Sequence, residues 1–173
     1  MAHSIELLLD PDSDAVIRTA WSMLADAGLP SQQRVTSPTN RPHVTLLAAR
    51  AISADADDAL RDLAAQLPLH GVIGAAVVFT GPRMTLARLI VPTAPLLALH
   101  RAVYETTVPF VTGEPFAHCR PGRWTPHVTL GRRFTAAAIG TALSAADASE
   151  VAAEMTGLRR WDGDARVDRV LVG

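Results

Sequence analysis

Two histidines and two threonines of this chain stand in identical five-residue stretches, Pro-His-Val-Thr-Leu at residues 42–46 and again at 126–130. Near neutral pH an imidazole can accept a proton and an imidazolium can give one, and a threonine hydroxyl can donate a hydrogen bond to an anionic oxygen. The histidines, His43 and His127, lie 84 residues apart (127 − 43), close to half of the chain. This spacing is expected if each half of a duplicated fold contributes one copy.

Each stretch has the composition of an extended strand, with β-branched Val and Thr after an entry proline. Side chains two residues apart share one face of a strand, so His43 and Thr45 point one way while Val44 and Leu46 point into the core. The same rule pairs His127 with Thr129. If the two strands face each other across a pseudo-two-fold axis, two imidazoles and two hydroxyls converge on one volume that can hold a phosphate. We therefore predict these four residues to be catalytic.

The composition excludes several other kinds of catalysis. All sixteen basic side chains are arginine, so Schiff-base chemistry, a lysyl-adenylate ligase intermediate and a lysine-containing phosphate loop are ruled out. With Cys119 as its one cysteine and no His-Glu-x-x-His stretch, the chain lacks the usual zinc patterns, and it has neither Gly-x-Gly-x-x-Gly nor Gly-x-Ser-x-Gly. We expect neither a cofactor nor a metal.

Size and charge limit the partners. The 173 residues are 49% hydrophobic, which fits a single domain over residues 1–173. The net charge of −1 argues against a broad basic surface for duplex DNA, so a nucleic-acid substrate is expected to be an RNA end or a small cyclic nucleotide. The sequence has no signal-peptide pattern and no apolar run that could span a membrane. We expect a cytoplasmic monomer with no membrane partner.

The elements that must position the two motifs follow from periodicity and from turn residues. The expected strands cover residues 4–9, the first motif, 71–80, 85–91, the second motif, 151–161 and 165–172, and the expected helices cover about 11–27, 53–67, 95–108 and 135–146. Loops over 30–41 and 109–125 lead into the motifs. The order is strand, helix, motif strand, helix, hairpin, helix, motif strand, helix, hairpin, so the second half echoes the first. This order predicts an α+β fold of two pseudo-symmetric lobes, each a small, mostly antiparallel sheet covered by helices, with a central active-site cleft.

The paired motifs resemble the signature of the two-histidine (2H) phosphoesterase superfamily, and within it the 2′-5′ RNA ligase-like proteins and RNA 2′,3′-cyclic phosphodiesterases. That signature is a pair of His-x-Thr/Ser-x motifs with hydrophobic x, one in each lobe, and residues 43–46 and 127–130 both match it. The resemblance implies a metal-independent phosphodiesterase that opens a cyclic phosphate, leaves a 2′-phosphate and can join RNA ends by a 2′-5′ linkage. It favours His127 as the base and His43 as the acid, although the symmetry of the motifs does not assign these roles. The alternative is a module that binds a nucleotide or phosphate in the same cleft without turning it over.

Four further residues are predicted to contact substrate. Arg132 lies where many members of the superfamily carry an arginine, three residues after the second threonine. Trp124, directly before the second motif, can stack on a base or pack in the core. Arg41 precedes the first motif and either contacts phosphate or is solvated, and His118 lies in the loop that leads to the second motif. The acidic run at residues 55–58 is interpreted as helix N-terminal charge that complements the helix dipole rather than as a metal site.

Overall fold

Strands and helices alternate along the chain in the predicted order. The computed structural model describes residues 1–146 and 149–173. The described helices are α1 (Pro11–Asp26), α2 (Ala56–Ala64), α3 (Ala94–Thr107) and α4 (Ala136–Ala145), with single 3₁₀ turns η1 (Gln32–Arg34), η2 (Val108–Phe110) and η3 (Ala117–Cys119). The described strands are β1 (His3–Leu9), β2 (His43–Ala49), β3 (Ala51–Ile52), β4 (Leu69–Phe79), β5 (Met84–Ile90), β6 (Val111–Thr112), β7 (His127–Phe134), β8 (Val151–Asp162) and β9 (Val167–Val172).

The main sheet has the strand order β1-β2-β7-β5-β4-β8-β9, and all of its pairings are antiparallel. The long strand β8 also pairs with β1, so the pairings run round a closed circuit of six strands with β9 added to β8. The two motif strands, β2 and β7, are joined by a single pair, Val44 with Val128. The sheet therefore has two halves, β1-β2-β8-β9 and β4-β5-β7, which meet at the motifs and again where β4 pairs with β8.

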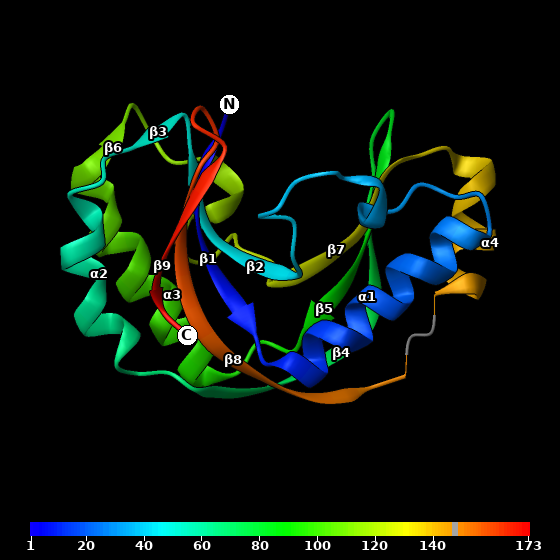
Figure 1. Ribbon diagram of the computed structural model, residues 1–173, viewed down its shortest axis with the longest axis horizontal. Helices are drawn as coiled ribbons and strands as arrows, with labels where there is room; N and C mark the ends of the chain where they lie inside the picture. The colour runs from blue at the N-terminus through cyan, green and yellow to red at the C-terminus, as the bar shows by residue number, and fades with distance from the viewer. Residues whose placement is uncertain (147–148) are drawn as a thin grey trace.

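The helices cover the two halves separately. α1 packs on β7 and β8 and against α4, while α2 and α3 pack on each other and against β9, β8 and β2. Figure 1 shows α2 and α3 on one side of the molecule and α1 and α4 on the other. The α+β class with a large antiparallel sheet is thereby confirmed.

The two halves of the sheet are not the two halves of the sequence. The chain repeats one unit, strand-helix-strand-helix-strand, as β1-α1-β2-α2-β4 and again as β5-α3-β7-α4-β8. The last strand of each unit crosses over, because β4 pairs with β5 and much of β8 pairs with β1. The first helix of each unit packs on the motif strand of the other unit, α1 on β7 and α3 on β2. Each motif strand is therefore supported by both repeats.

The predicted boundaries are close, and the differences have local causes. Asp10 caps α1 by accepting hydrogen bonds from the backbone N–H groups of Asp12 and Ser13, and Gly28 follows the helix at a φ of 72°. The second helix is shorter than expected and ends at Ala64, ahead of Pro68, where a chain in helical conformation is disfavoured. The expected loop after α3 also contains β6, which pairs with β3 as a two-stranded sheet that sequence reasoning missed.

The alternate residues of the motif strands enter the core as predicted. Val44, Leu46, Val128 and Leu130 are buried and belong to the main hydrophobic cluster with residues of α1, α2 and α3. Alternation with a fixed period of two leaves the histidines and threonines on the other face. Among the described residues, no helix is long and apolar enough to cross a membrane.

Candidate active site

The two motif histidines are the first residues of their strands and are held in the same way. The Nδ1 atom of His43 lies 2.7 Å from the carbonyl oxygen of Arg41, and Nδ1 of His127 lies 2.7 Å from that of Thr125. Because a carbonyl oxygen only accepts hydrogen bonds, Nδ1 carries the hydrogen in both rings. Each neutral imidazole therefore keeps its lone pair on Nε2, which is the form that a general base needs.

The register between the motif strands places all four side chains on one face. Val44 is paired with Val128, so the antiparallel register sets Thr129 opposite His43 and His127 opposite Thr45. Residues directly opposite each other in a sheet point to the same side. The two histidines and Thr45 are partly exposed there, and Thr129 is buried with 9% of its surface exposed. The structure thus brings the four predicted catalytic residues together at the junction of the two halves.

A tryptophan indole binds a backbone carbonyl oxygen of each motif strand. The indole N–H of Trp21, on α1, donates to the carbonyl oxygen of Thr129 at 2.9 Å, and that of Trp124 donates to the carbonyl oxygen of Thr45 at 2.8 Å. The Trp124 ring also stacks on His100, with 3.9 Å between ring centroids and 3° between planes. Trp124 is therefore held from within the protein, and a contact with substrate stays a prediction. Sequence reasoning missed Trp21.

His43 faces a buried carboxylate. Its Nε2 lies 3.6 Å from Oε1 of Glu6, a residue of β1. Burial alone would raise the pKa of Glu6, but the charges of His43 and Arg159, with hydrogen bonds from Ser4 and Arg159, outweigh it and lower that pKa. Glu6 is thus an anion at neutral pH, and it attracts a positive charge on His43. A single acidic residue in the apolar stretch at 5–9 was the available sequence signal for this missed contact.

His127 has the opposite electrostatic surroundings. Burial lowers its pKa, the hydrogen bond to Thr125 raises it, and repulsion from the positive charges of Arg132, His43 and His118 lowers it further. The net pKa lies below 6.5, so the ring is mostly neutral at neutral pH. The Phe79 ring, from β4, packs at 4.5 Å between centroids and contributes to this burial. Sequence reasoning missed Phe79.

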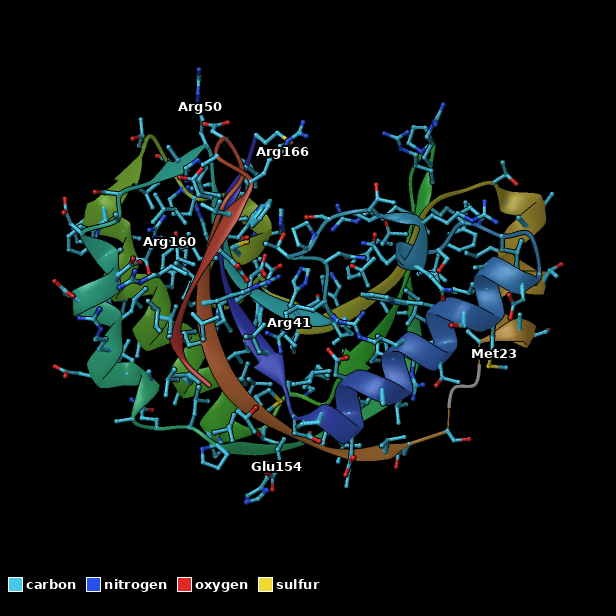
Figure 2. The ribbon with its side chains drawn as sticks, viewed as in Figure 1. Met23, Arg41, Arg50, Glu154, Arg160 and Arg166 are labelled. Carbon is cyan, nitrogen blue, oxygen red and sulfur yellow. The ribbon has the colours of Figure 1, made fainter. Side chains whose placement is uncertain are left out.

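The remaining predicted substrate contacts lie around this centre. Arg132, exposed on β7, and His118, in η3, are both near enough to His127 to act on its pKa. Arg41 lies toward the middle of the molecule in Figure 2 and contributes its carbonyl oxygen to His43. Among the described residues, no group of three or more His, Cys, Asp or Glu side chains is arranged to hold a metal ion.

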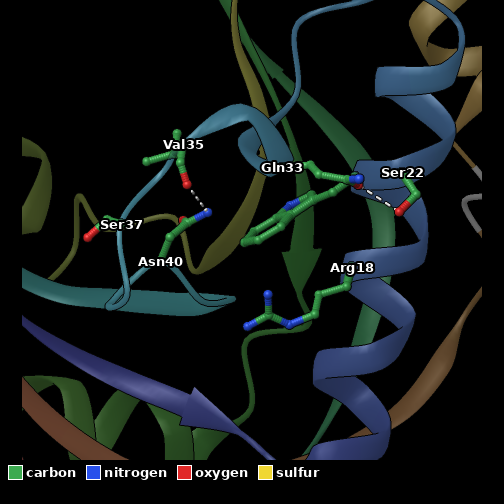
Figure 3. Close-up of a pocket in the computed structure, with 7 residues that line it drawn as sticks. Arg18, Ser22, Gln33, Val35, Ser37 and Asn40 are labelled. Atoms are coloured by element: carbon green, nitrogen blue, oxygen red, sulfur yellow. Dashed lines mark hydrogen bonds between the residues drawn. The ribbon is translucent and has the colours of Figure 1, made fainter.

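Two cavities flank the motif strands without being lined by the motif residues. One, of about 330 Å³, lies between α1 and the loop before β2 and is shown in Figure 3. Some of its polar groups pair with each other, as Ser22 does with Gln33 and Asn40 with the carbonyl oxygen of Val35. The other, of about 580 Å³, lies beside Trp124 and His100. The predicted cleft at the histidines therefore remains a prediction.

Comparison with known proteins places the chain in a family. No curated protein matches the sequence. Similar solved structures include Usb1 of Kluyveromyces marxianus (13% identity, 99% of this chain and 98% of that chain, TM-score 0.55), Escherichia coli LigT complexed with 3′-AMP (15%, 99% and 93%, 0.56) and TT0787 of Thermus thermophilus (17%, 99% and 95%, 0.59). These likenesses show the fold. The family model of the 2′-5′ RNA ligase superfamily matches residues 9–166, which is most of the sequence and includes both motifs. The chain therefore belongs to the 2′-5′ RNA ligase superfamily of 2H phosphoesterases.

Proposed function

We propose that this protein is a metal-independent phosphodiesterase that opens 2′,3′-cyclic phosphates on RNA ends or small nucleotides. The observation that carries the proposal is the register of β2 and β7, which gathers two imidazoles and two hydroxyls on one face. Membership of the superfamily supports a phosphodiesterase-type function. The structures of Usb1 with uridine monophosphate and of LigT with 3′-AMP show that proteins of this fold hold nucleotides.

In the proposed reaction His127 is the base and His43 the acid. His127 is mostly neutral at neutral pH, so its Nε2 can take a proton from a water molecule that attacks the phosphorus. As the bond from phosphorus to the 3′ oxygen breaks, the protonated His43 gives its Nε2 proton to that oxygen. The product keeps a 2′-phosphate, and the two histidines exchange one proton each with the reactants.

The threonines and Arg132 would stabilise charge rather than transfer protons. The hydroxyls of Thr45 and Thr129 lie on the same face as the histidines and can donate to the non-bridging phosphate oxygens. Arg132, exposed on β7, can neutralise part of the negative charge that builds up there. If the 5′-hydroxyl of a second RNA end takes the place of water as nucleophile, the same base and acid form a 2′-5′ linkage as the bond to the 3′ oxygen breaks, so RNA ends can be joined without a nucleotide cofactor. The histidines exchange roles when that linkage is cleaved back to the cyclic phosphate.

The test is turnover of a substrate panel by His43→Ala and His127→Ala. The panel holds 2′,3′-cyclic mononucleotides, an oligonucleotide with a cyclic end and an ADP-ribose cyclic phosphate, all assayed with a chelator present. We expect each variant to lose about 10²–10⁴-fold in kcat/KM, the usual contribution of a general acid or base. His70→Ala is the control, because His70 is a highly exposed histidine that pairs with Glu154 on the β4–β8 pair.

Three results would contradict the proposal. Full activity of either motif variant would remove that histidine from the chemistry. Turnover that requires an added metal ion would instead make the histidines ligands. Tight nucleotide binding by wild-type protein, with no turnover of any substrate in the panel, would favour a pure binding module.

A further inference from the structure

A buried cluster of charged side chains lies directly behind His43. Glu6 is 3% exposed and Arg159, from β8, is 2% exposed. Arg159 binds Oε2 of Glu6 through Nε at 2.8 Å and through Nη2 at 2.7 Å. Its Nη1 donates to Asp168 of β9 at 2.7 Å and to the carbonyl oxygen of Thr39 at 3.0 Å. The cluster thus joins three strands of one half of the sheet to the loop that leads into the first motif.

The strand register aims this cluster at the catalytic face. Glu6 is paired with Thr45 on one side and with Arg159 on the other, so the three side chains share the face that carries His43. The neighbouring arginine points the other way. Arg160 binds the carboxylate of Asp57 through two hydrogen bonds, at 2.6 and 3.0 Å, and lies on the α2 side of the sheet (Figure 2). The two consecutive arginines therefore lie on different faces, and Arg159 binds the carboxylate that faces His43.

The charges of the cluster do not balance without His43. Glu6 and Asp168 bring two negative charges and Arg159 one positive charge, so the cluster has a net negative charge, with the Glu6 carboxylate nearest to Nε2 of His43 and Asp168 at the partly exposed rim. A proton on His43 offsets this net charge, because its Nε2 faces the buried carboxylate. The titratable groups that face His43 are Glu6 from β1, with Arg159 and Asp168 behind it, and His127 from β7.

We propose that Glu6, anchored by Arg159, is a positioning residue that holds His43 protonated and oriented as the general acid. This inference rests on the proposed function. The separation of 3.6 Å between Oε1 and Nε2 is short enough for attraction between opposite charges but too long for a hydrogen bond. The Nε2 proton therefore stays available for the leaving oxygen. Oε1 is itself fixed by the hydroxyl of Ser4 at 2.5 Å, so the carboxylate cannot readily turn to capture that proton.

The second repeat lacks this device at the corresponding positions. In the first repeat Glu6 is paired with the motif residue Thr45, and in the second the residue paired with Thr129 is Ala87. The strand partner of Glu6 is Arg159, whereas the partner of Ala87 is Val77. A carboxylate and a guanidinium are thus replaced by two apolar side chains. Two identical motifs thus have different electrostatic surroundings.

The test is the pH dependence of kcat/KM for Glu6→Gln, which keeps the shape of the side chain and removes its charge. We expect the alkaline limb of the profile, which reports the acid, to move to lower pH by about one unit or more, as is typical when an opposite charge is removed from a few ångströms away. At pH values above the alkaline limbs of both wild type and Glu6→Gln, the kcat/KM of the variant is then about tenfold or more below that of wild type. The acid limb, which reports His127, should move much less.

Asp57→Asn is the matched control, because it removes the carboxylate of the other buried arginine pair on β8. We expect it to lower stability and to leave both limbs in place. If Glu6→Gln does not fold, Asp168→Asn replaces it, since this residue lies at the rim of the cluster with 22% of its side chain exposed. It should move the alkaline limb in the same direction by a smaller amount.

NMR titration of the His43 ring separates this inference from the function on which it rests, because it needs no turnover. A lower titration midpoint for His43 in Glu6→Gln than in wild type supports the inference even if no substrate is found. An unchanged midpoint, or an unmoved alkaline limb in an active variant, overturns it while leaving the proposed function intact. A wild-type protein without turnover contradicts only the function.

Discussion

The two motif regions share their backbone geometry and differ in their electrostatics. In both, Nδ1 of the histidine bonds to the carbonyl oxygen two residues earlier at 2.7 Å, and an indole N–H bonds to the carbonyl oxygen of the threonine. Around His43 stands a buried carboxylate, whereas around His127 stand an aromatic ring and positive charges. The repeated motifs therefore place the reacting groups, and residues that differ between the two repeats give each histidine its own electrostatic surroundings.

The shared placement of the two motifs is consistent with the packing of each repeat against the other. Each motif strand is paired with a strand of its own repeat and supported by a helix of the other, so both strands are fixed at their single junction. Equal support keeps the four polar side chains on one face. The residues paired with the two threonines can then differ, Glu6 with Thr45 and Ala87 with Thr129, while the four polar side chains stay in place.

Replacing Phe79 by alanine tests whether apolar burial keeps the pKa of His127 low. Phe79 packs on His127, and burial is the largest cause of the lowered pKa of that ring. Opening this side to water should raise the His127 pKa toward 6.5, so the acid limb of kcat/KM should move to higher pH and activity below the limb should fall several-fold. Measured pH–rate profiles of Phe79→Ala and wild type give the result.

The control for this variant is Val78→Ala, because Val78 directly precedes Phe79 on β4 and packs against the core. It should cost stability and leave the acid limb unmoved. If Phe79→Ala also leaves the limb where it is, the low pKa of His127 arises from its charged neighbours alone.

Replacing the two tryptophans tests the indole hydrogen bonds that both motif regions share, and the expected effect is smaller than those above. Trp21→Phe removes the N–H that binds the carbonyl oxygen of Thr129, and because Trp21 is only 3% exposed we expect a loss of about 1–3 kcal/mol in the free energy of unfolding. Trp124→Phe removes the equivalent bond to Thr45 in a half-buried place, where water can replace the donor, so the loss should be nearer 1 kcal/mol. Denaturant unfolding measures both, and equal or absent losses would contradict this view of the support.

The sequence predicted what depends on local pattern. The period of two in the motif strands placed Val44 and Val128 in the core, and the order of strands and helices was confirmed, as was the superfamily. Helix ends were predicted where a cap or a break stood in the sequence, as at Asp10 and Gly28. These features are set by a few neighbouring residues, which is why one sequence was enough.

The rest depends on partners that are far apart in the chain. Arg159 is 153 residues from Glu6, and Trp21 is 108 residues from Thr129, so no local pattern joins them. The acidic run lies at the N-cap and first turn of α2, where it complements the helix dipole as interpreted. The sequence did not show that Asp57 is also buried against Arg160, 103 residues away. The crossing of β4 and β8 between the halves was missed for the same reason. The asymmetry of the site lies entirely among such distant contacts.

The most direct test of the account is a change of leaving group in His43→Ala and His127→Ala. A nucleotide p-nitrophenyl phosphodiester releases a stable phenolate that needs no proton, whereas opening a cyclic phosphate releases a ribose oxygen that does. We expect His43→Ala to fall by about 10²–10⁴-fold in kcat/KM on the cyclic substrate and to come within about tenfold of wild type on the nitrophenyl ester. His127→Ala should stay impaired on both. Equal impairment of the two variants on the nitrophenyl ester, or rescue of His127→Ala alone, would contradict the assignment of base and acid.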